Sequence, residues 1–304
     1  MKAKKKIQWK LYLPLYLMML PGSIYLIINN YIPMGGLVLA FKKYNYQLGM
    51  WKSPWNGLKN FKFLTMGSDA VKMIRNTLGY NLAFIVLGTV LAIVVAILLN
   101  EVTSSKAKKT YQTLILIPYL ISTVIVSYIV YAFLSQDNGF INNTILGADH
   151  AVSWYTEPKY WPFILTFVSM WKSFGYSSII YYATIIGIDT TYYEAAAIDG
   201  AGKLRQIFSV TLPCLKPTII TLVLLSVGRI FYSDFGLFYQ IPMNSGTLLD
   251  VTQTIDTYVY RALLASNDIG RSAAAGFLQS ILGFILVFSA NLVVNRIDKE
   301  NALF

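Results

Sequence analysis

Long runs of apolar residues alternate along this chain with short polar segments. Two runs show the pattern clearly, LGYNLAFIVLGTVLAIVVAILL at 78–99 and LILIPYLISTVIVSYIVYAFL at 114–134. Neither contains a charged residue, and each reaches the ~20 residues that a helix needs to cross a bilayer. The pattern predicts an all-α membrane protein with six transmembrane helices, at 11–30, 76–99, 112–134, 161–186, 217–240 and 273–294.

The first of these ranges has a second interpretation, because an apolar segment after a basic start is also typical of a secretory signal peptide. This segment is longer than the apolar core of a signal peptide, and no small-residue cleavage site follows it. Pro14 and Pro21 interrupt it, which a membrane helix tolerates when its neighbours satisfy the freed backbone groups. We therefore expect a retained helix.

Basic residues predict the orientation. If the N-terminus is inside, 13 lysines and arginines lie in inner segments and ten in outer ones. The outer excess is in one long loop, and short loops weigh most in the positive-inside rule, so both termini are expected inside. The prediction gives a basic cytoplasmic N-terminus at 1–10, an extracellular loop at 31–75, a cytoplasmic segment at 188–216 and a cytoplasmic tail at 297–304.

Composition agrees with a membrane protein and offers little chemistry. Only 13% of residues are charged and the mean hydropathy is +0.53, whereas a soluble domain is about 25% charged. Attraction to anionic inner-leaflet lipid accounts for much of the net charge of +11, so no nucleic acid is expected. Cys214 is the only cysteine and His150 the only histidine, so neither a disulfide nor a metal site is predicted.

One polar segment, YYEAAAIDGAGKLRQIFSVTLPCLKP at 192–217, separates two apolar runs. Thr191 and Glu194 have the spacing of a capping box, which predicts a helix start. Gly200 permits a bend, a second short helix is expected at about 201–210, and Pro213 should end it. Two interpretations stay open: an amphipathic loop that rests on lipid, or a docking element for a soluble partner.

This segment resembles the EAA loop of permease subunits of binding-protein-dependent ABC importers. That pattern is E-A-A, three residues, G, nine residues and I-x-L-P, and Val210 replaces its isoleucine here. The likeness covers roughly 70–296, while 20–45 and 57–64 resemble the maltose-type sugar permeases, particularly the branch that imports oligosaccharides from complex polysaccharides. The residues that carry the EAA resemblance are Glu194, Ala195, Ala196, Asp199, Gly200, Ala201, Leu212 and Pro213.

The resemblance implies a type I ABC importer permease fold, with a transmembrane domain at 76–296 and cytoplasmic coupling helices. It also implies the partners: a second permease subunit, two ATPase subunits that bind ATP and Mg, an extracellular binding protein and an oligosaccharide, in the bacterial cytoplasmic membrane. On this resemblance, the chain itself is expected to need no cofactor and not to be an enzyme. It contains no G-x-x-x-x-G-K-[ST] motif, since Gly202-Lys203-Leu204 lacks the leading glycine and the hydroxyl.

Three charges fall inside predicted spans: Lys172, Arg229 and Asp234. Charges at membrane depth are costly and usually face a cavity or a partner. Five residues along a helix correspond to a rotation of roughly 140°, so Arg229 and Asp234 should not pair. Either a carboxylate of the second permease or an anionic sugar is expected to neutralise the excess positive charge.

Aromatic residues near these charges are candidates for the solute path. Tyr232, Phe235 and Tyr239 would share one face of a helix, and Trp171 and Tyr176 lie in the preceding span. Such rings could stack on sugar rings, or they could simply pack helix against helix.

Two other function classes fit the sequence less well. An ion-gradient-driven secondary transporter often shows an internal repeat with broken helices, and no such duplication is visible. An intramembrane enzyme would need catalytic residues at depth, and no Ser/His/Asp set or paired carboxylates stand where they could act together. The identity of the oligosaccharide, and whether it is acidic or neutral, is not encoded in any pattern that we find.

Overall fold

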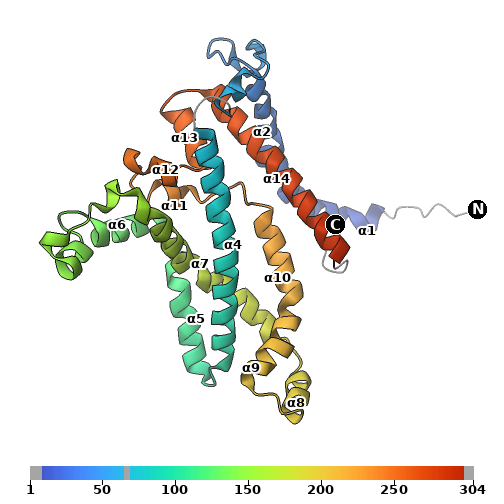
Figure 1. The fold of residues 1–304 in the computed structure, drawn as a ribbon. Coiled ribbons are helices and arrows are strands. Elements are labelled where there is room, and N and C mark those ends of the chain that lie inside the picture. The colour runs from blue at the N-terminus through green and yellow to red at the C-terminus, as the bar shows by residue number, and fades with distance from the viewer. Residues whose placement is uncertain (1–8, 65–68, 298–304) are drawn as a thin grey trace, which may run out of the picture.

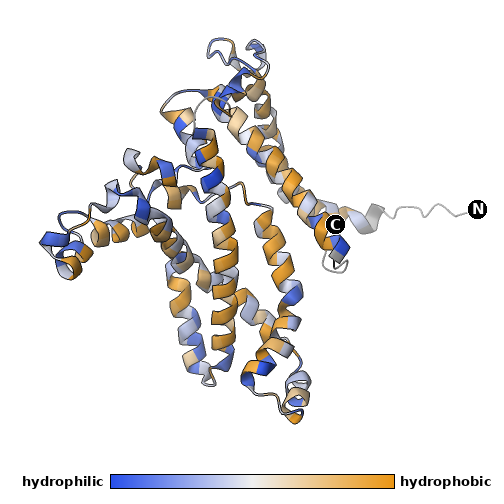
Figure 2. Cartoon of the chain, viewed as in Figure 1, coloured by the Kyte–Doolittle hydropathy of each residue, from blue (hydrophilic) through white to orange (hydrophobic). Residues whose placement is uncertain are grey.

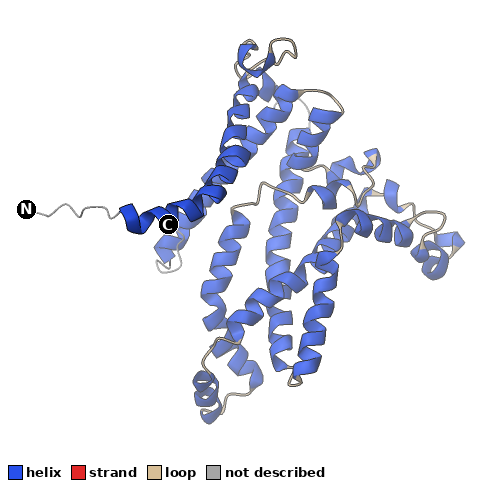
Figure 3. Cartoon of the chain, turned by 180° about the vertical axis from the view of Figure 1, so that it is seen from behind, coloured by secondary structure: helices blue, strands red, loops and turns tan. Residues whose placement is uncertain are grey.

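The computed structural model describes residues 9–64 and 69–297. The basic residues from Lys2 to Lys6 and the tail from 298 lie outside the described residues, together with the expectations made for them. The described part is helical, and it contains one isolated antiparallel bridge, between Lys42 and Trp55, in place of strands (Figure 3).

The first apolar run forms one long helical rod. It consists of α1 (Trp9–Leu26), a wide π turn at Ile27–Tyr31, α2 (Ile32–Met34) and a tighter 3₁₀ stretch at Gly35–Phe41. The rod extends well past the predicted end at residue 30, because the sequence YIPMGGLVLAF that follows is equally apolar. The segment after it carries the short α3 (Gly49–Lys52) and a 3₁₀ turn at Lys59–Leu64.

The predicted third span is two helices rather than one. After α4 (Asp69–Glu101), the chain forms α5 (Ser105–Leu120) and α6 (Thr123–Leu134), whose axes differ by 91°. Ser122 ends the continuity, because its extended backbone starts a new helix and its hydroxyl accepts the Ile125 amide at 3.4 Å. The prediction of an unbroken helix at 112–134 was therefore wrong.

The remaining helices follow an irregular stretch of short turns between 135 and 160. Three of them are long, namely α7, α10 and α14, and the helices between these are short. Their bounds are α7 (Trp161–Ile185), α8 (Thr190–Ile198), α9 (Lys203–Gln206), α10 (Leu212–Val227), α11 (Phe235–Tyr239), α12 (Leu249–Thr252), α13 (Ile255–Leu264) and α14 (Ile269–Ile297).

The number of spans is only partly supported. Four helical stretches of the described residues are long and apolar enough to cross a membrane, namely Tyr12–Phe41, Asp69–Glu101, Lys203–Val227 and Ile269–Arg296, and the bent α5–α6 pair makes a possible fifth. At 1.5 Å per residue the 25 residues of α7 extend roughly 37 Å, which is also enough to cross. Its sequence is less apolar, so the count of six stays a prediction.

Helix α4 is the centre of the structure, and α7 packs along it (Figure 1). The helical rod that begins with α1 runs beside α14, and this pair leans away from the other helices in both views (Figures 1 and 3). Three buried clusters follow α4 from end to end. Representative members are Ala40, Met73 and Ala274 in the first, Tyr80, Trp161 and Phe238 in the second, and Ala96, Tyr181 and Leu215 in the third.

The outer faces of the long helices are apolar (Figure 2). Met18, Phe163 and Phe284 are more than two-thirds exposed, at 79%, 77% and 71%. A soluble protein rarely exposes so much contiguous apolar surface. Helices surrounded by lipid account for it, and the polar side chains gather instead at helix ends and in loops.

Candidate functional site

The predicted fifth span is interrupted in its second half. Helix α10 ends at Val227, and α11 begins only at Phe235. Between them the amides of Arg229 and Ile230 form turns back to Ser226 and Val227, at 3.0 and 3.1 Å. The prediction of a continuous helix at 217–240 was therefore wrong, and the 140° argument that separated Arg229 from Asp234 does not apply to this non-helical segment.

Asp234 contributes to the interruption. Its backbone is extended, and its carboxylate accepts the Leu237 amide at 3.1 Å, so it is the N-cap of α11. A residue in this role starts a helix rather than continuing one. Its neighbours 228–233, here called the broken segment, are consequently held outside both helices.

Three helices provide side chains that bind the broken segment. From α4, the Asn81 amide donates to the carbonyls of Ile230 and Tyr232 at 2.8 and 2.9 Å. From α14, Gln279 donates to the Phe231 carbonyl at 2.7 Å. From α13, the Asp256 carboxylate accepts the Ser233 amide at 2.6 Å. The broken segment is thus a fixed part of the structure.

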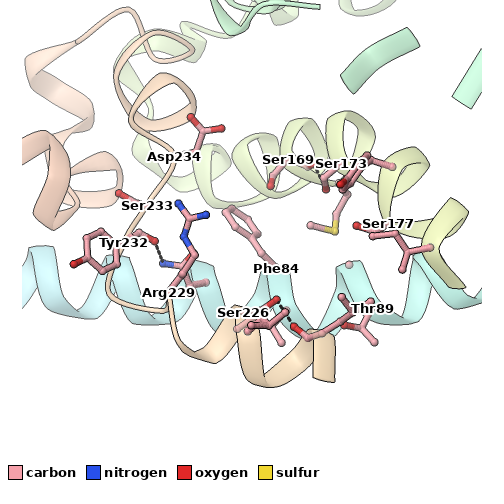
Figure 4. Close-up of a pocket in the computed structure, with 18 of the residues that line it drawn as sticks. Phe84, Thr89, Ser169, Ser173, Ser177, Ser226, Arg229, Tyr232, Ser233 and Asp234 are labelled. Carbon is pink, nitrogen blue, oxygen red and sulfur yellow. Dashed lines mark hydrogen bonds between the residues drawn. The ribbon is translucent and has the colours of Figure 1, made fainter. Parts of the chain in front are cut away.

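A cavity of about 680 Å³ lies against this segment, between α4, α7 and α10 (Figure 4). Its volume is in the range of sites for small molecules. Figure 4 shows the Arg229 side chain extending into the cavity near Phe84. The polar residues of the wall are Asn81, Thr89, Ser169, Ser173, Tyr176, Ser177, Tyr181, Ser226, Arg229, Tyr232, Ser233 and Asp234.

Hydroxyl groups dominate the wall on the α7 side. Ser169, Ser173 and Ser177 recur every four residues, which places them on one face of α7. The Ser173 hydroxyl donates to the Ser169 carbonyl at 2.7 Å, so its lone pairs remain available to a ligand. Our sequence reasoning missed this face, although the spacing of four was visible in the sequence.

Arg229 is the cationic residue of the wall. None of the described residues forms an ion pair with it, although the Asp234 carboxylate lines the same cavity. An arginine offers five N–H donors in a rigid plane. The wall therefore combines one positive group with hydroxyl groups and an aromatic surface, which suits a polar ligand with carboxylate or hydroxyl groups.

Four of the eight predicted solute-path residues line this cavity: Tyr176, Arg229, Tyr232 and Asp234. Tyr176 is also stacked on Tyr119, with ring centroids 4.7 Å apart. These four residues come from α7 and from the segment around the break. The cavity brings them together across the bundle.

The other four predicted residues do not line it. Trp171 packs against a buried apolar cluster, and Lys172, the adjacent residue on α7, is absent from the wall. Phe235 and Tyr239 stack on each other at 4.9 Å, and both rings contact Tyr260 in tilted or edge-on geometry. Tyr232 precedes α11, so the expected aromatic face of Tyr232, Phe235 and Tyr239 on one helix does not exist.

The segment with the EAA pattern forms two short helices around a turn. Gly200 has φ +77°, which confirms the bend that was expected there. The capping box predicted from Thr191 and Glu194 was wrong, because Asp189 is the N-cap of α8 and accepts the Thr191 amide at 2.9 Å. This hydrogen bond lowers the pKa of the Asp189 carboxyl.

Pro213 does not end the second short helix. From Lys203 the chain stays helical through α9, a π turn at Ile207–Thr211 and α10, as far as Val227. The wider π turn ends at Thr211, two residues before Pro213, and makes room for a ring that would clash in a regular α-helix. The second short helix is therefore continuous with α10, so a displacement of one must move the other.

The stretch from Asp189 to Thr211 is here named the coupling loop, after the role that the resemblance implies for it. Its far side is uncovered. Ile198, Leu204 and Phe208 are 87%, 73% and 68% exposed. On its near side, Lys203 forms an ion pair with Glu101 at the end of α4, at 3.2 Å. The predicted residues Glu194, Ala195, Asp199 and Gly200 are exposed, whereas Ala196 and Ala201 are half-buried.

The described residues contain no group of three histidine, cysteine or acidic side chains that could bind a metal ion. Cys214 is exposed at the start of α10. The cavity and the uncovered coupling loop are therefore the two features that bear on function.

Comparison with known proteins gives a consistent result. Residues 88–299 match the family described as binding-protein-dependent transport system inner membrane component. The chain is 37% identical over 288 residues to the polygalacturonan/rhamnogalacturonan transport system permease protein YteP of Bacillus subtilis (strain 168), covering 94% of this chain and 89% of that protein.

Solved structures agree with the family match. One is a crystal structure of a bacterial ABC transporter involved in the import of the acidic polysaccharide alginate, with a TM-score of 0.86, 32% identity and coverage of 95% of this chain and 98% of the other. A second shows the bacterial alginate ABC transporter in complex with an alginate pentasaccharide-bound periplasmic protein, with a TM-score of 0.85, 33% identity and coverage of 96% and 97%.

Proposed function

The chain belongs to the family of binding-protein-dependent transport system inner membrane components, and from this membership we propose that it is the permease subunit of an ATP-driven importer that moves an acidic oligosaccharide across the membrane. The proposal covers the solute, the passage and the coupling to ATP. Membership itself makes the chain a membrane subunit of a transport system with an all-helical type I ABC permease fold.

The observation that carries the solute proposal is the composition of the cavity wall. Hydroxyl groups and aromatic rings suit a saccharide, and Arg229, which has no ion-pair partner among the described residues, suits a carboxylate on it. The names of the relatives support the same class, since they refer to polygalacturonan and to the acidic polysaccharide alginate. We therefore favour the anionic sugar over a carboxylate of a second permease as the partner of Arg229.

The coupling loop is proposed to dock into a cytoplasmic ATPase that binds ATP and Mg. Its apolar side chains are uncovered, and α9 continues into α10, which lines the cavity. A push on the loop would therefore reach the cavity wall through one helix. A second permease and a second ATPase complete the assembly in this proposal, and an extracellular binding protein delivers the solute, in line with the periplasmic protein in the related alginate complex.

The alternative of an ion-gradient-driven carrier gains no support from the comparisons.

Six spans and cytoplasmic termini complete the proposal. They are supported by the length of α7 and by the basic residues in the short loops.

Reconstitution tests the proposal directly. The chain would be purified with its permease and ATPase partners and placed in proteoliposomes with the binding protein, and uptake of uronate oligosaccharides would be measured. We expect uptake that requires ATP on the ATPase side and persists without any ion gradient. Uptake driven by a proton or sodium gradient, without ATP, would refute it.

Variants of the turn in the coupling loop locate the coupling in the same assay. Gly200→Pro should abolish uptake and solute-stimulated ATP hydrolysis, because φ +77° is closed to proline. Gly202→Ala is the matched control, since its Cβ would meet no atom within 4 Å. Full uptake by the proline variant would show that this loop does not couple ATP hydrolysis to transport.

A further inference from the structure

We infer that Asp256 is a positioning residue of the cavity: its carboxylate fastens the broken segment to α13 and α14, and so sets the placement of the cavity groups that the segment carries. The inference rests on the proposed function, because a positioning role has meaning only for a cavity that binds a solute. Asp256 itself does not line the cavity. It acts through Ser233, which does.

An interrupted helix inside a membrane protein leaves backbone groups without their helical hydrogen-bond partners. Backbone groups that leave a helix away from water must find other hydrogen-bond partners, or they cost several kcal/mol each. Ile230 and Phe231 in the broken segment are only 8% and 7% exposed. Their freed carbonyls therefore depend on side chains of the surrounding helices.

Side chains satisfy four backbone groups of the segment in sequence order. Asn81 donates to the carbonyls of residues 230 and 232, and Gln279 donates to the carbonyl of residue 231, at 2.7 to 2.9 Å. The next group is an amide rather than a carbonyl, that of Ser233, and it meets the Asp256 carboxylate at 2.6 Å. At each position a side-chain amide donates to a backbone carbonyl, or the carboxylate accepts from the backbone N–H.

Asp256 connects more than one of these partners. One of its carboxylate oxygens also lies 2.8 Å from the Ser233 hydroxyl, and the other accepts from Gln279 at 3.2 Å. The Ser233 hydroxyl is also 2.7 Å from the hydroxyl of Thr254, which is fully buried. The carboxylate therefore joins α13, α14 and the broken segment in one network.

The network is anchored at its far side. The start of α13 is fixed to α4, because the Ile255 amide donates to the buried Thr77 hydroxyl at 3.0 Å. Asp256 is the next residue, so its backbone has little freedom to follow a moving segment. The segment is the part that adjusts, because without the carboxylate Ser233 loses the partner of its amide and one of the two partners of its hydroxyl, and keeps only the contact with Thr254.

Ser233 lies between two residues of the cavity wall, Tyr232 and Asp234 (Figure 4). A shift of Ser233 therefore moves both of them, and with them the approach to Arg229. Removal of Asp256 should accordingly weaken solute binding more than the rate of a saturated transport cycle. A residue that only stabilised the fold would instead lower the amount of assembled protein and leave the KM of the remainder unchanged.

The test compares Asp256→Ala, the conservative Asp256→Asn and the matched control Asp250→Ala. Asp250 is a carboxylate whose side-chain ion pair, with Lys72 at 2.6 Å, is away from the broken segment. In the reconstituted importer we expect Asp256→Ala to raise the KM for a uronate oligosaccharide several-fold with a smaller change in maximal rate. Asp256→Asn, which keeps one acceptor oxygen for Ser233, should recover part of the loss, and the control should match the unmodified protein.

A second readout needs no transport. With Cys214 replaced by serine, Tyr232→Cys would be labelled with a thiol reagent in the absence of solute, with and without Asp256→Ala. We expect a several-fold change in the labelling rate, whether or not the importer accepts the sugar tested. This separates failure of the inference from failure of the proposed function, which would show as absent uptake in the unmodified protein.

Ser233→Ala covers the case in which Asp256→Ala does not assemble. It removes the hydroxyl contacts but keeps the amide contact, so a smaller KM increase in the same direction is expected. Unchanged KM and unchanged labelling in Asp256→Ala, or in Ser233→Ala if only that variant assembles, would overturn the inference. So would a KM change of equal size in Asp250→Ala.

Discussion

Arg229 is the residue on which the solute class depends. Its guanidinium lines the cavity, and no described carboxylate pairs with it. We predict that Arg229→Gln slows uptake of an acidic oligosaccharide by about tenfold to a hundredfold, since a hydrogen bond to a charged group contributes about 1.5–3 kcal/mol. Uptake of the neutral counterpart should change much less, and initial rates with labelled sugars measure both.

Arg229→Lys is the matched variant, because it keeps the charge and loses the planar donor pair. It should retain most of the preference for the acidic sugar. If Arg229→Gln slows both sugars equally, the arginine serves the structure and the cavity charge says nothing about the solute.

Asp189 offers a second test at the same scale. Its carboxylate caps α8, and an N-cap replaced by alanine costs ~1 kcal/mol of helix stability. We predict that Asp189→Ala lowers solute-stimulated ATP hydrolysis, because the first helix of the coupling loop frays. Asp189→Asn should behave like the unmodified protein, since asparagine caps equally well; loss of hydrolysis in both variants would indicate that the charge matters for docking.

The pKa shift of Asp189 gives the sign of a pH effect on this cap. The pKa is lowered in the folded protein, so the stabilisation is present above the ordinary aspartate pKa of about 3.9. It is lost as the pH falls through the lowered value. Coupling near neutral pH should therefore not depend on this group's titration.

Residue types were more predictable than their surroundings. The EAA pattern identified Gly200 correctly, because a glycine at a turn carries its own conformational reason. Only four of the twelve polar residues of the cavity wall were predicted, because serines such as Ser169, Ser173 and Ser177 are neither charged nor aromatic and so do not stand out in an apolar run. Trp171 and Phe235 were predicted as solute-path residues because they are aromatic, yet they pack against apolar and aromatic neighbours.

At the scale of elements, one close approach fixes the position of α7. A Cβ on Gly175 would collide with the backbone carbonyl of Ile115 on α5. We predict that Gly175→Ala forces these helices apart and lowers the free energy of unfolding by about 1–3 kcal/mol. Thermal unfolding in detergent would show this as a lower Tm and a smaller yield of assembled protein.

Gly276→Ala is the control for this substitution. It lies within α14, where its Cβ would meet no atom within 4 Å, so alanine should be neutral or stabilising by about 0.5–1 kcal/mol. A Tm for Gly175→Ala that equals the Tm of this control would show that α5 and α7 have room to separate.

The long helices were predicted better than their interruptions. Apolar length alone indicated 76–99 and 273–294, and α4 and α14 cover both ranges. The breaks near 121 and 228–233 could not be predicted in this way, because both lie inside uncharged or nearly uncharged runs. The break at 228–233 depends on partners from distant elements, such as Asn81, Asp256 and Gln279, which no local pattern reveals. The break near 121 occurs at Ser122, which caps α6.

For the molecule as a whole, α4 relates the two candidate sites. Near its start, Asn76 donates to the carbonyls of Asp250 and Gln253 beside α13, and at its end Glu101 pairs with Lys203 of the coupling loop. The cavity lies between these two ends, against α4 and α10. A change at the coupling loop can therefore reach the cavity through α10, while the contacts of Asn76 hold the other end of α4 in place.

This arrangement makes the side of the membrane testable, because the two ends of α4 must be on opposite sides. We predict that a thiol reagent that cannot cross membranes labels Ser266→Cys and His150→Cys from outside, and does not label Ser105→Cys. Ser266 follows α13 at the outer end, and Ser105 follows α4 near the coupling loop (Figure 1). Ser266 is used rather than Asn267, because φ +51° at Asn267 would strain a cysteine.

Cys214 must first be replaced by serine, since it is exposed and would be labelled itself in opened cells. Permeabilised cells provide the control, in which Ser105→Cys should become accessible. The physical basis is the excess of lysines in the short inner loops, including Lys106, Lys108 and Lys109 beside Ser105. Labelling of Ser105→Cys in intact cells would reverse the orientation, place the coupling loop outside, and leave it without access to a cytoplasmic ATPase.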